Sequence, residues 1–463
     1  LLSTDARGTV DDSGPAGHLA SVSFGRHAAV RDWTLHGAWT IAGSARQAWD
    51  VGAELHWLHT RWQWEVAGDR NPDLANRIVP WPYGLPGASL PDSLDSRLDY
   101  RRAAAWIQHH AEIGARMSLQ TGIRVDRNDL ARGAAVSPRA SIIVRLDGAT
   151  RLTADAGVYR QSPGYEKLLL SDYFIDLGAG EPLRSARAVH AALGVERDLL
   201  PGISARVEAY RKSYADLIVG RLETEGERLA RLARYDFGEF TAHLPTEPEI
   251  TSIPENGASG VAYGVDALLT RSAAARDPRV TGWLSYSYGV ARRTAYGYTV
   301  PFDYDRRHTL SGVAEFRLHP FVTVSGMIRL ASGSPWTAPS GVRIAAREDT
   351  ADSDGDGNVT ELIPARDAQG YLVYTHDLGD LARTNSSRLP FYARLDARVT
   401  YQPGGAQGRW SLYVDVVNLH NRENPGLVTC RVGGASNGGV PGFVREPDFS
   451  VPFLPSVGVR FRF

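Results

Sequence analysis

The last residues of the chain alternate between apolar and polar side chains and end on an aromatic ring. The residues of one strand face are Val457, Val459, Phe461 and Phe463. Those of the opposite face are Ser456, Gly458, Arg460 and Arg462. Because successive strand residues point to opposite faces, the apolar row can face lipid while the charged row faces a water-filled lumen. The pattern therefore predicts a strand of a transmembrane β-barrel.

The same alternation recurs through most of the chain. From Phe391 to Tyr401, apolar residues at every second position oppose a row of acids, bases and hydroxyls. Similar stretches begin at Met117, Leu152 and Ile203. Their length of about 10–12 residues suits a strand that crosses a bilayer and exceeds that of most sandwich strands. A soluble β-sandwich with one solvated sheet face is the alternative interpretation.

Composition excludes several other classes of protein. The chain has no run of about 18 apolar residues, which argues against a helical membrane protein. Its net charge of −1 gives no bulk electrostatic attraction to nucleic acid. The single Cys430 excludes an internal disulfide framework and a cysteine-based zinc site. Residues 1–5 lack the features of a signal peptide, so we expect that the export signal was removed or that the N-terminus of the parent is missing.

Alternation and turn residues together predict about 16 strands. They lie near 18–27, 31–43, 50–66, 98–112, 115–127, 138–146, 149–160, 184–198, 202–216, 257–272, 280–291, 307–319, 321–333, 389–402, 408–420 and 453–463. Short links alternate with long connections at 67–97, 161–183, 217–256, 334–388 and 421–452. Outer-membrane barrels have short periplasmic turns and long external loops. With the C-terminus in the periplasm, every long connection falls outside, and 334–388 becomes a long external loop.

Several short motifs occur in a fixed order between about residue 100 and the C-terminus. They are Gly122–Asp126 with Ser137–Ser141, Gly157–Pro163, Ser185–His190 with Gly194–Glu196, Val207–Lys212, Asp305–Leu310, Ala331–Thr337, Arg383–Pro390 and Asp415–Arg422. In this order and spacing they resemble the C-terminal part of the barrel of TonB-dependent outer-membrane receptors. The resemblance also implies that the terminal aromatic is a recognition signal for the outer-membrane assembly machinery.

The resemblance implies a monomeric 22-stranded barrel with an N-terminal plug in its lumen. It implies uptake of a scarce ligand such as a siderophore, cobalamin or an oligosaccharide, driven by an inner-membrane complex that pulls on a short N-terminal box. The sequence shows neither plug nor box, and it contains about six strands fewer than such a barrel. Unpaired backbone in lipid costs several kcal/mol per group, so an incomplete barrel is not expected to stand alone. We therefore expect residues 1–463 to be the C-terminal portion of a longer receptor, with its plug domain absent from this chain.

Two rival functions remain open at this point. About 16 strands also suits a passive porin, which is an allowed even-stranded barrel. A barrel enzyme such as a lipase or protease is the other rival, but no phosphate loop, nucleophile elbow or Ser/His/Asp set can be placed on a scaffold. We therefore expect a protein that is not an enzyme, requires no cofactor, lies in outer-membrane lipid and binds no nucleic acid.

An acidic motif lies inside the predicted loop 334–388. The ligands that it would offer to calcium are Asp352, Asp354, Asp356, the backbone oxygen of Asn358, and Glu361. Alternating acids followed by Gly match the opening of an EF-hand loop, in which carboxylates surround a hard cation. The position that should hold a bidentate Glu is Ile363, and no flanking helix pattern is evident. The motif leaves two interpretations open, a structural calcium site that stiffens the loop and a solvated acidic loop tip.

Aromatic residues gather in three predicted external loops, together with arginines on the predicted lumen faces. The candidate ligand-binding rings are Trp81, Tyr83, Tyr165, Tyr173, Tyr235 and Phe237. They could stack on a siderophore or sugar, or belong to an interfacial girdle and loop-on-loop packing. The lumen arginines are Arg124, Arg151, Arg206, Arg394, Arg398, Arg460 and Arg462. They could guide an anionic ligand, contact a plug, or pair across strands with Asp126, Asp155, Glu208 and Asp396.

Overall fold

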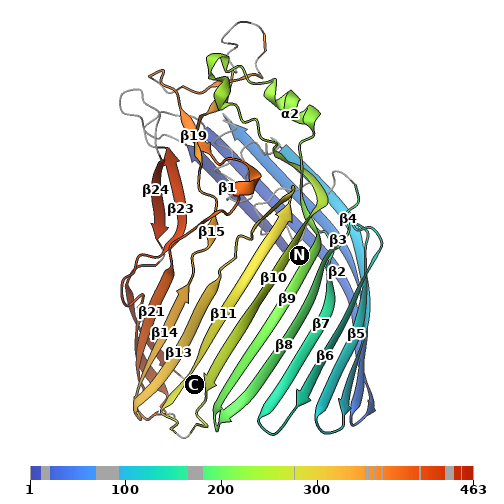
Figure 1. Ribbon diagram of the computed structural model, residues 1–463, viewed down its shortest axis with the longest axis vertical. Helices are drawn as coiled ribbons and strands as arrows, with labels where there is room; N and C mark the ends of the chain where they lie inside the picture. Colours follow the sequence, from blue (N-terminus) through green and yellow to red (C-terminus); the bar gives the residue numbers. More distant parts are fainter. Residues whose placement is uncertain are drawn as a thin grey trace.

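The protein forms one large curved antiparallel sheet with a cluster of loops at one end, as the computed structural model shows (Figure 1). The structure describes residues 2–11, 21–68, 93–164, 181–275, 277–349, 352, 355, 357–358, 360–366, 369–405, 408–432, 443–449 and 451–461. The sheet has 17 strands, of which β12 contains only 4 residues. About 16 strands were predicted, and the fold class is confirmed.

The bounds of the strands in this sheet follow the chain. They are β1 (Leu2–Asp11), β2 (Ser21–Ser44), β3 (Gln47–Gly68), β4 (Ser93–Ile113), β5 (Met117–Asn128), β6 (Ala134–Arg145), β7 (Thr150–Gln161), β8 (Ala186–Leu200), β9 (Ile203–Leu222), β10 (Ile250–Arg271), β11 (Val280–Ala295), β12 (Tyr298–Pro301), β13 (His308–His319), β14 (Val322–Ala331), β21 (Tyr392–Tyr401), β22 (Trp410–Val417) and β25 (Leu454–Phe461).

Neighbouring strands in the sequence are neighbours in the sheet. Pairing runs without a crossover from β1 to β11, then through β13 and β14 to β21, β22 and β25. Within the described part of the chain, no pairing joins β1 to β25, so these strands are the two edges and the barrel is not closed. The prediction that the plug is absent from this chain stays a prediction.

The N-terminal strands differ from the prediction. The segments 18–27 and 31–43 were predicted as two strands, but residues 21–44 form the single strand β2, which pairs with β3 in a continuous register from Val22 to Ala42. The reason is that no Gly, Pro or Asn lies between His27 and Arg31 to turn the chain. The structure also contains β1, which was not predicted.

Short turns lie at one end of the sheet and long connections at the other, as predicted (Figure 1). We call these the turn end and the loop end. The β8–β9 turn contains Gly202 at φ +74°, and a Cβ on this residue would lie 2.2 Å from the backbone nitrogen of Ala275. Only glycine fits such a close approach of two turns. The β6–β7 turn is closed by Asp147, whose carboxylate accepts the backbone N–H of Ala149 at 2.7 Å.

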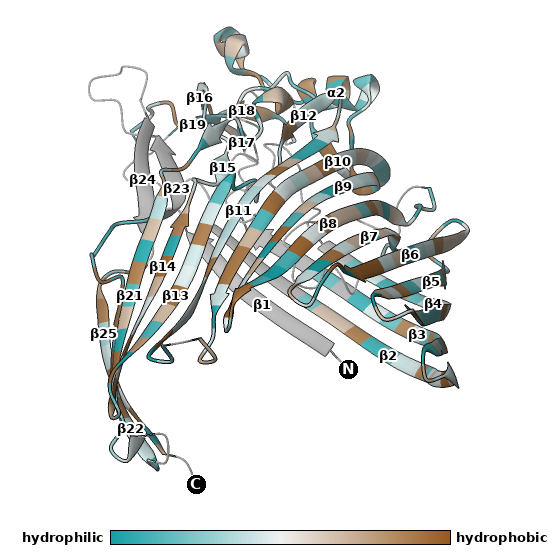
Figure 2. Ribbon diagram, turned by 60° about the horizontal axis from the view of Figure 1, so that its bottom comes forward, coloured by the Kyte–Doolittle hydropathy of each residue, from teal (hydrophilic) through white to brown (hydrophobic). Residues whose placement is uncertain are grey.

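The two faces of the sheet differ in chemistry, and the strands therefore carry alternating apolar and polar bands (Figure 2). One face exposes large apolar side chains, including Trp39 at 64%, Leu193 at 63% and Val457 at 70% exposure. The opposite face carries charged residues such as Arg151 and Glu196, which form an ion pair of 2.5 Å. A sheet that exposes its apolar face and pairs its charges on the other is the inverse of a water-soluble fold.

No helix in the described residues is both long enough and apolar enough to cross a membrane. The longest described helix, α2 (Glu225–Leu232), has 8 residues and lies among the loops.

Candidate functional site: the loop cluster

The connections β9–β10 and β14–β21 fold against each other at the loop end. Their short elements are α2, η2 (Gly238–His243), β15 (Pro335–Trp336), β16 (Gly341–Ile344), β17 (Ala346–Glu348), β18 (Leu362–Pro364), β19 (Tyr374–Asp377), η3 (Leu381–Arg383) and β20 (Ser387–Arg388). The connection β22–β25 adds the hairpin of β23 (Pro425–Val432) and β24 (Phe443–Phe449). Figure 1 shows these elements standing above the sheet.

An apolar cluster joins the first two connections. Phe237, Ile344, Ala346 and Leu362 are at most 3% exposed and pack together. A parallel β-bridge between Tyr235 and Leu362 adds backbone hydrogen bonds between the same connections. Together these contacts make 217–256 and 334–388 one packed unit, because each connection covers the apolar residues of the other.

A capping box fixes the start of α2. Thr224 accepts the backbone N–H of Glu227, and the Glu227 carboxylate accepts the backbone N–H of Thr224 at 2.7 Å. The two terminal guanidinium nitrogens of Arg221, Nη1 and Nη2, also donate to this carboxylate from the end of β9, at 2.8 and 2.7 Å. The Arg221 guanidinium, with help from Thr224, lowers the pKa of Glu227 to about 2. The charged carboxylate therefore ties α2 to the rim of the sheet.

A second ion cluster closes the base of the same loop. Arg231 donates from Nε to Glu223 at 2.8 Å and lies 3.3 Å from Glu249, with these side chains only 9–14% exposed. Its Nη1 also donates to the backbone oxygen of Pro245 at 2.8 Å. One arginine thus joins α2 to the residue that follows β9 and to the residue that precedes β10.

Asp305 connects three of the motifs on which the family resemblance rests. Its side chain is fully buried, accepts a 2.9 Å hydrogen bond from Nε of Arg307, and also pairs with Arg388. The backbone N–H of Ala291 donates to the other carboxylate oxygen at 2.7 Å. Arg388 further donates to the backbone oxygen of Gly333 at 3.2 Å. Asp305 therefore joins the motifs at 305–310 and 383–390 directly, and Arg388 extends the connection to the motif at 331–337.

Buried asparagines bind the loop backbone nearby. Asn385 has φ +57° and donates to the backbone oxygen of Pro301 at 3.0 Å. Asn418 and Asn424 are each 1% exposed. The Asn424 side chain accepts the backbone N–H of Ala393 at 2.8 Å and donates to the backbone oxygen of Ala393 at 2.7 Å. It thus makes the two hydrogen bonds that a neighbouring strand would make. These family-like motifs thus hold the loops to the strand ends, a role that composition alone did not reveal.

The predicted aromatic site is only partly within the described residues. Trp81, Tyr83, Tyr165 and Tyr173 lie outside them. The rings of Tyr235 and Phe237 meet edge to face, with centroids 5.4 Å apart. Phe237 is 2% exposed, which is what the loop-packing interpretation predicts for it. The assignment of these rings to ligand binding stays a prediction.

The acidic loop is likewise described in part, since Asp354 and Asp356 lie outside the described residues. Asp352 has φ +50° and accepts the backbone N–H of Gly357 at 3.0 Å. The Asn358 side chain donates to Glu361 at 3.0 Å. Among the residues that the structure describes, no group of three or more His, Cys, Asp or Glu is suited to bind a metal ion. A calcium site here stays a prediction.

The lumen-facing arginines pair with carboxylates, but not always with the predicted ones. Arg206–Glu208 and Arg394–Asp396 join residues two apart on one strand, at 2.5 and 2.8 Å, rather than residues across strands. Residues i and i+2 share a face and lie within the reach of an arginine. Arg151 pairs with Glu196 and not with Asp155.

Other partners come from strand register. Arg124 pairs with Glu54 and with Asp126, and Arg398 pairs with Asp415 on the neighbouring strand. The sequence analysis missed Glu54, Glu196 and Asp415, because the register that brings them opposite an arginine cannot be read from spacing along the chain. Predicting these carboxylate partners would therefore have required the exact register of the strands.

A known protein family matches most of this chain. The family described as TonB dependent receptor-like, beta-barrel matches residues 3–419. No curated protein matches the chain.

Several solved structures have a similar fold. The outer membrane transporter YddB from Escherichia coli is 13% identical with a TM-score of 0.53, covering 96% of this chain and 55% of that one. The ferric citrate transporter FecA in its unliganded form is 14% identical with a TM-score of 0.53, covering 99% and 57%. The ferripyoverdine receptor of Pseudomonas aeruginosa, bound to ferripyoverdine, is 11% identical with a TM-score of 0.52, covering 99% and 53%. The chain therefore spans little more than half the length of these structures.

Proposed function

Because the chain belongs to the TonB-dependent receptor-like β-barrel family, we propose that it forms the barrel wall of a receptor for energised uptake of a scarce ligand. The protein lies in the bacterial outer membrane. We place its loop end outside the cell, because outer-membrane barrels have long external loops and short periplasmic turns. The observation that carries the proposal is the packed loop unit above a lumen lined by paired charges. Such a unit can present a shaped surface to a ligand, whereas a passive pore needs none.

A ferric siderophore or another ferric chelate is the ligand class that we place first. Two of the similar solved structures are a ferric citrate transporter and a ferripyoverdine receptor by their own descriptions. Cobalamin and oligosaccharides are the other classes. The inner-membrane energising complex is the proposed partner. The family comprises receptors and transporters, and we propose no enzymatic activity.

The lumen pairs support transport of this kind. An arginine paired with a carboxylate presents little net charge, so the wall neither traps nor repels an anionic chelate strongly. Selectivity then falls to the loops. A porin that attracts anions would instead present unpaired arginines in its lumen.

The test is growth and uptake in a strain that lacks the gene. Its uptake of ferric chelates, cobalamin and oligosaccharides is compared with that of the complemented strain, with and without a protonophore. We expect the complemented strain to accumulate one ligand class above the medium, and the protonophore to abolish this accumulation. Uptake that persists with the protonophore would identify a passive porin instead.

A further inference from the structure

Arginines end the apolar rows on the outward face of the sheet. On several strands, the row that exposes apolar side chains is followed toward the loop end by an exposed or half-buried arginine. We call this set the arginine belt. Its members are Arg31 on β2, Arg101 on β4, Arg127 on β5, Arg160 on β7, Arg187 on β8, Arg211 on β9 and Arg292 on β11.

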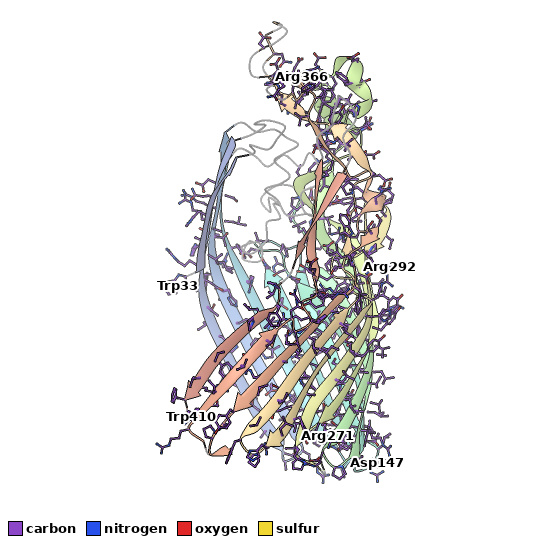
Figure 3. The ribbon with its side chains drawn as sticks, turned by 90° about the vertical axis from the view of Figure 1, so that its left-hand side faces the viewer. Trp33, Asp147, Arg271, Arg292, Arg366 and Trp410 are labelled. Carbon is purple, nitrogen blue, oxygen red and sulfur yellow. The ribbon has the colours of Figure 1, made fainter. Side chains whose placement is uncertain are left out.

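Strand register shows that the belt faces outward. Arg187 shares its face of β8 with the exposed Val189, Leu193 and Val195. Arg160 shares its face of β7 with Leu152, whose partner on β8 is Val195. In Figure 3, Arg292 and Trp33, which follows Arg31 on the same face, lie at similar heights, far above Trp410 and Asp147. The belt thus follows the upper limit of the apolar face on distant parts of the wall.

The belt differs from the lumen arginines in its partners. Arg124, Arg151 and Arg398 each pair with a carboxylate inside the lumen. Of the belt, only Arg101 has a carboxylate partner among the described residues, Asp129 at 3.5 Å. Within the residues that the structure describes, the other six belt charges have no carboxylate partner.

Two belt residues lie directly opposite each other. Arg160 and Arg187 are Cα partners across β7 and β8, and Nε of Arg160 is buried with no hydrogen-bond partner in the described structure. Like charges in this relation repel and destabilise the sheet unless an anion lies between them. Arg211 on the next strand, β9, adds a third outward charge. Its Cα partner on β10 is Tyr263, which is 45% exposed.

On the same face at the turn end, the rows of β8 and β10 also reach arginines, but each of these has a partner within the protein. Arg197 donates to the Thr150 hydroxyl at 3.2 Å, and Arg271 donates to the backbone oxygen of Val280 at 3.0 Å. Other outward rows end there in apolar or aromatic residues, such as Leu318 and Trp410, which are 59% and 42% exposed. The two rims of the apolar face thus suit two different leaflets. An arginine fork matches the paired oxygens of a phosphate group, and the apolar row below it matches acyl chains.

We propose that the arginine belt binds the phosphate groups of a phosphorylated lipid of the outer leaflet, with Arg160, Arg187 and Arg211 as the main contact. The lipid phosphate lies between Arg160 and Arg187 and removes their mutual repulsion. Its acyl chains then lie along the exposed apolar row of β8 below.

The test compares two triple variants of the protein purified from the outer membrane in detergent. The belt variant is R160Q/R187Q/R211Q. The control variant R116Q/R145Q/R279Q removes the same charge from exposed arginines at the turn end. Binding of bis-phosphorylated lipid A is measured beside that of dephosphorylated lipid A, and the heat-dependent shift in gel migration shows that each variant is folded.

We expect the belt variant to bind bis-phosphorylated lipid A at least about tenfold more weakly, with a smaller salt dependence, and the control variant to bind it as the parent does. The triple lysine variant at the belt positions keeps the charge and should retain most of the affinity. Equal affinity of the parent for dephosphorylated lipid A, or unchanged binding by the folded belt variant, would overturn the proposal. So would equally tight binding of inorganic phosphate, which would identify a site for free anions.

Discussion

The buried carboxylate of Asp305 is the residue on which the loop attachments depend most. Replacing it with alanine leaves Arg307 and Arg388 without their shared partner. Removing one partner of a buried ion pair costs about 3–5 kcal/mol, here as local stability of the loops. We expect D305A to make the loop 334–388 sensitive to protease on intact cells while the barrel remains folded. The control is D277A, which removes an exposed partner of Arg279 and should change protease sensitivity little.

Glu227 makes the attachment of α2 dependent on pH. Its pKa falls from 4.5 to about 2 in the folded loop, so its contribution to stability is fully present above about pH 4.5 and is lost as the pH falls through about 2. We expect the hydrogen-exchange protection factors of residues 221–232, which are corrected for the intrinsic pH dependence of exchange, to fall in the parent as the pH drops from about 4.5 to about 2. The E227Q variant should exchange faster at pH 7 and lose this pH dependence, whereas E239Q, at another exposed glutamate of the loop, should behave as the parent does.

For single residues, the face of the sheet on which a side chain lies could be predicted better than the residue with which it pairs. Outward and inward rows follow from alternation, so the lumen position of Arg124 or Arg398 is evident from the sequence. Their partners Glu54 and Asp415 depend on register between strands far apart in sequence. The burial of Phe237 depends on a contact with Ile344, which lies on a different loop. No local pattern encodes such contacts.

Among the elements, the β8–β9 turn is tightly restricted. Gly202 has φ +74°, and an added Cβ would collide with the backbone of the neighbouring turn at Ala275. We expect G202A to reduce the yield of folded barrel and to lower the urea midpoint of unfolding in lipid vesicles, at a cost of at least about 1 kcal/mol. The control G148A, on the turn before it, adds a Cβ with nothing within 4 Å and should fold normally. Equal yields from both variants would contradict this account of the turn.

Strands were predictable where a turn residue and an apolar row coincide. The Pro201-Gly202 turn separates β8 from β9 as predicted. The division of β2 at residues 28–30 was wrong because loss of alternation was taken for a turn, although no turn-forming residue is present. That part of β2 rises into the loop end, where Ala28 and Val30 pack with Leu58 and Tyr100 in a buried cluster. Alternation fails there because the two faces of this segment no longer contact lipid on one side and water on the other.

For the whole molecule, the defining property is an apolar surface that faces lipid rather than water. Leu193 is 63% exposed in the middle of the outward row of β8, and Leu146 is 49% exposed in the β6–β7 turn. In water, both L193R and L146R would be nearly neutral, because each side chain is already exposed. In a bilayer, an outward arginine near the midplane costs about 2–4 kcal/mol and one near the interface about 0–1 kcal/mol. We therefore expect L193R, but not L146R, to lower the free energy of unfolding by roughly that amount in lipid vesicles. The measurement is the urea midpoint of the heat-dependent gel shift. Equal midpoints for the two variants would mean that this face of the sheet is covered by protein, since only lipid contact makes the cost depend on depth.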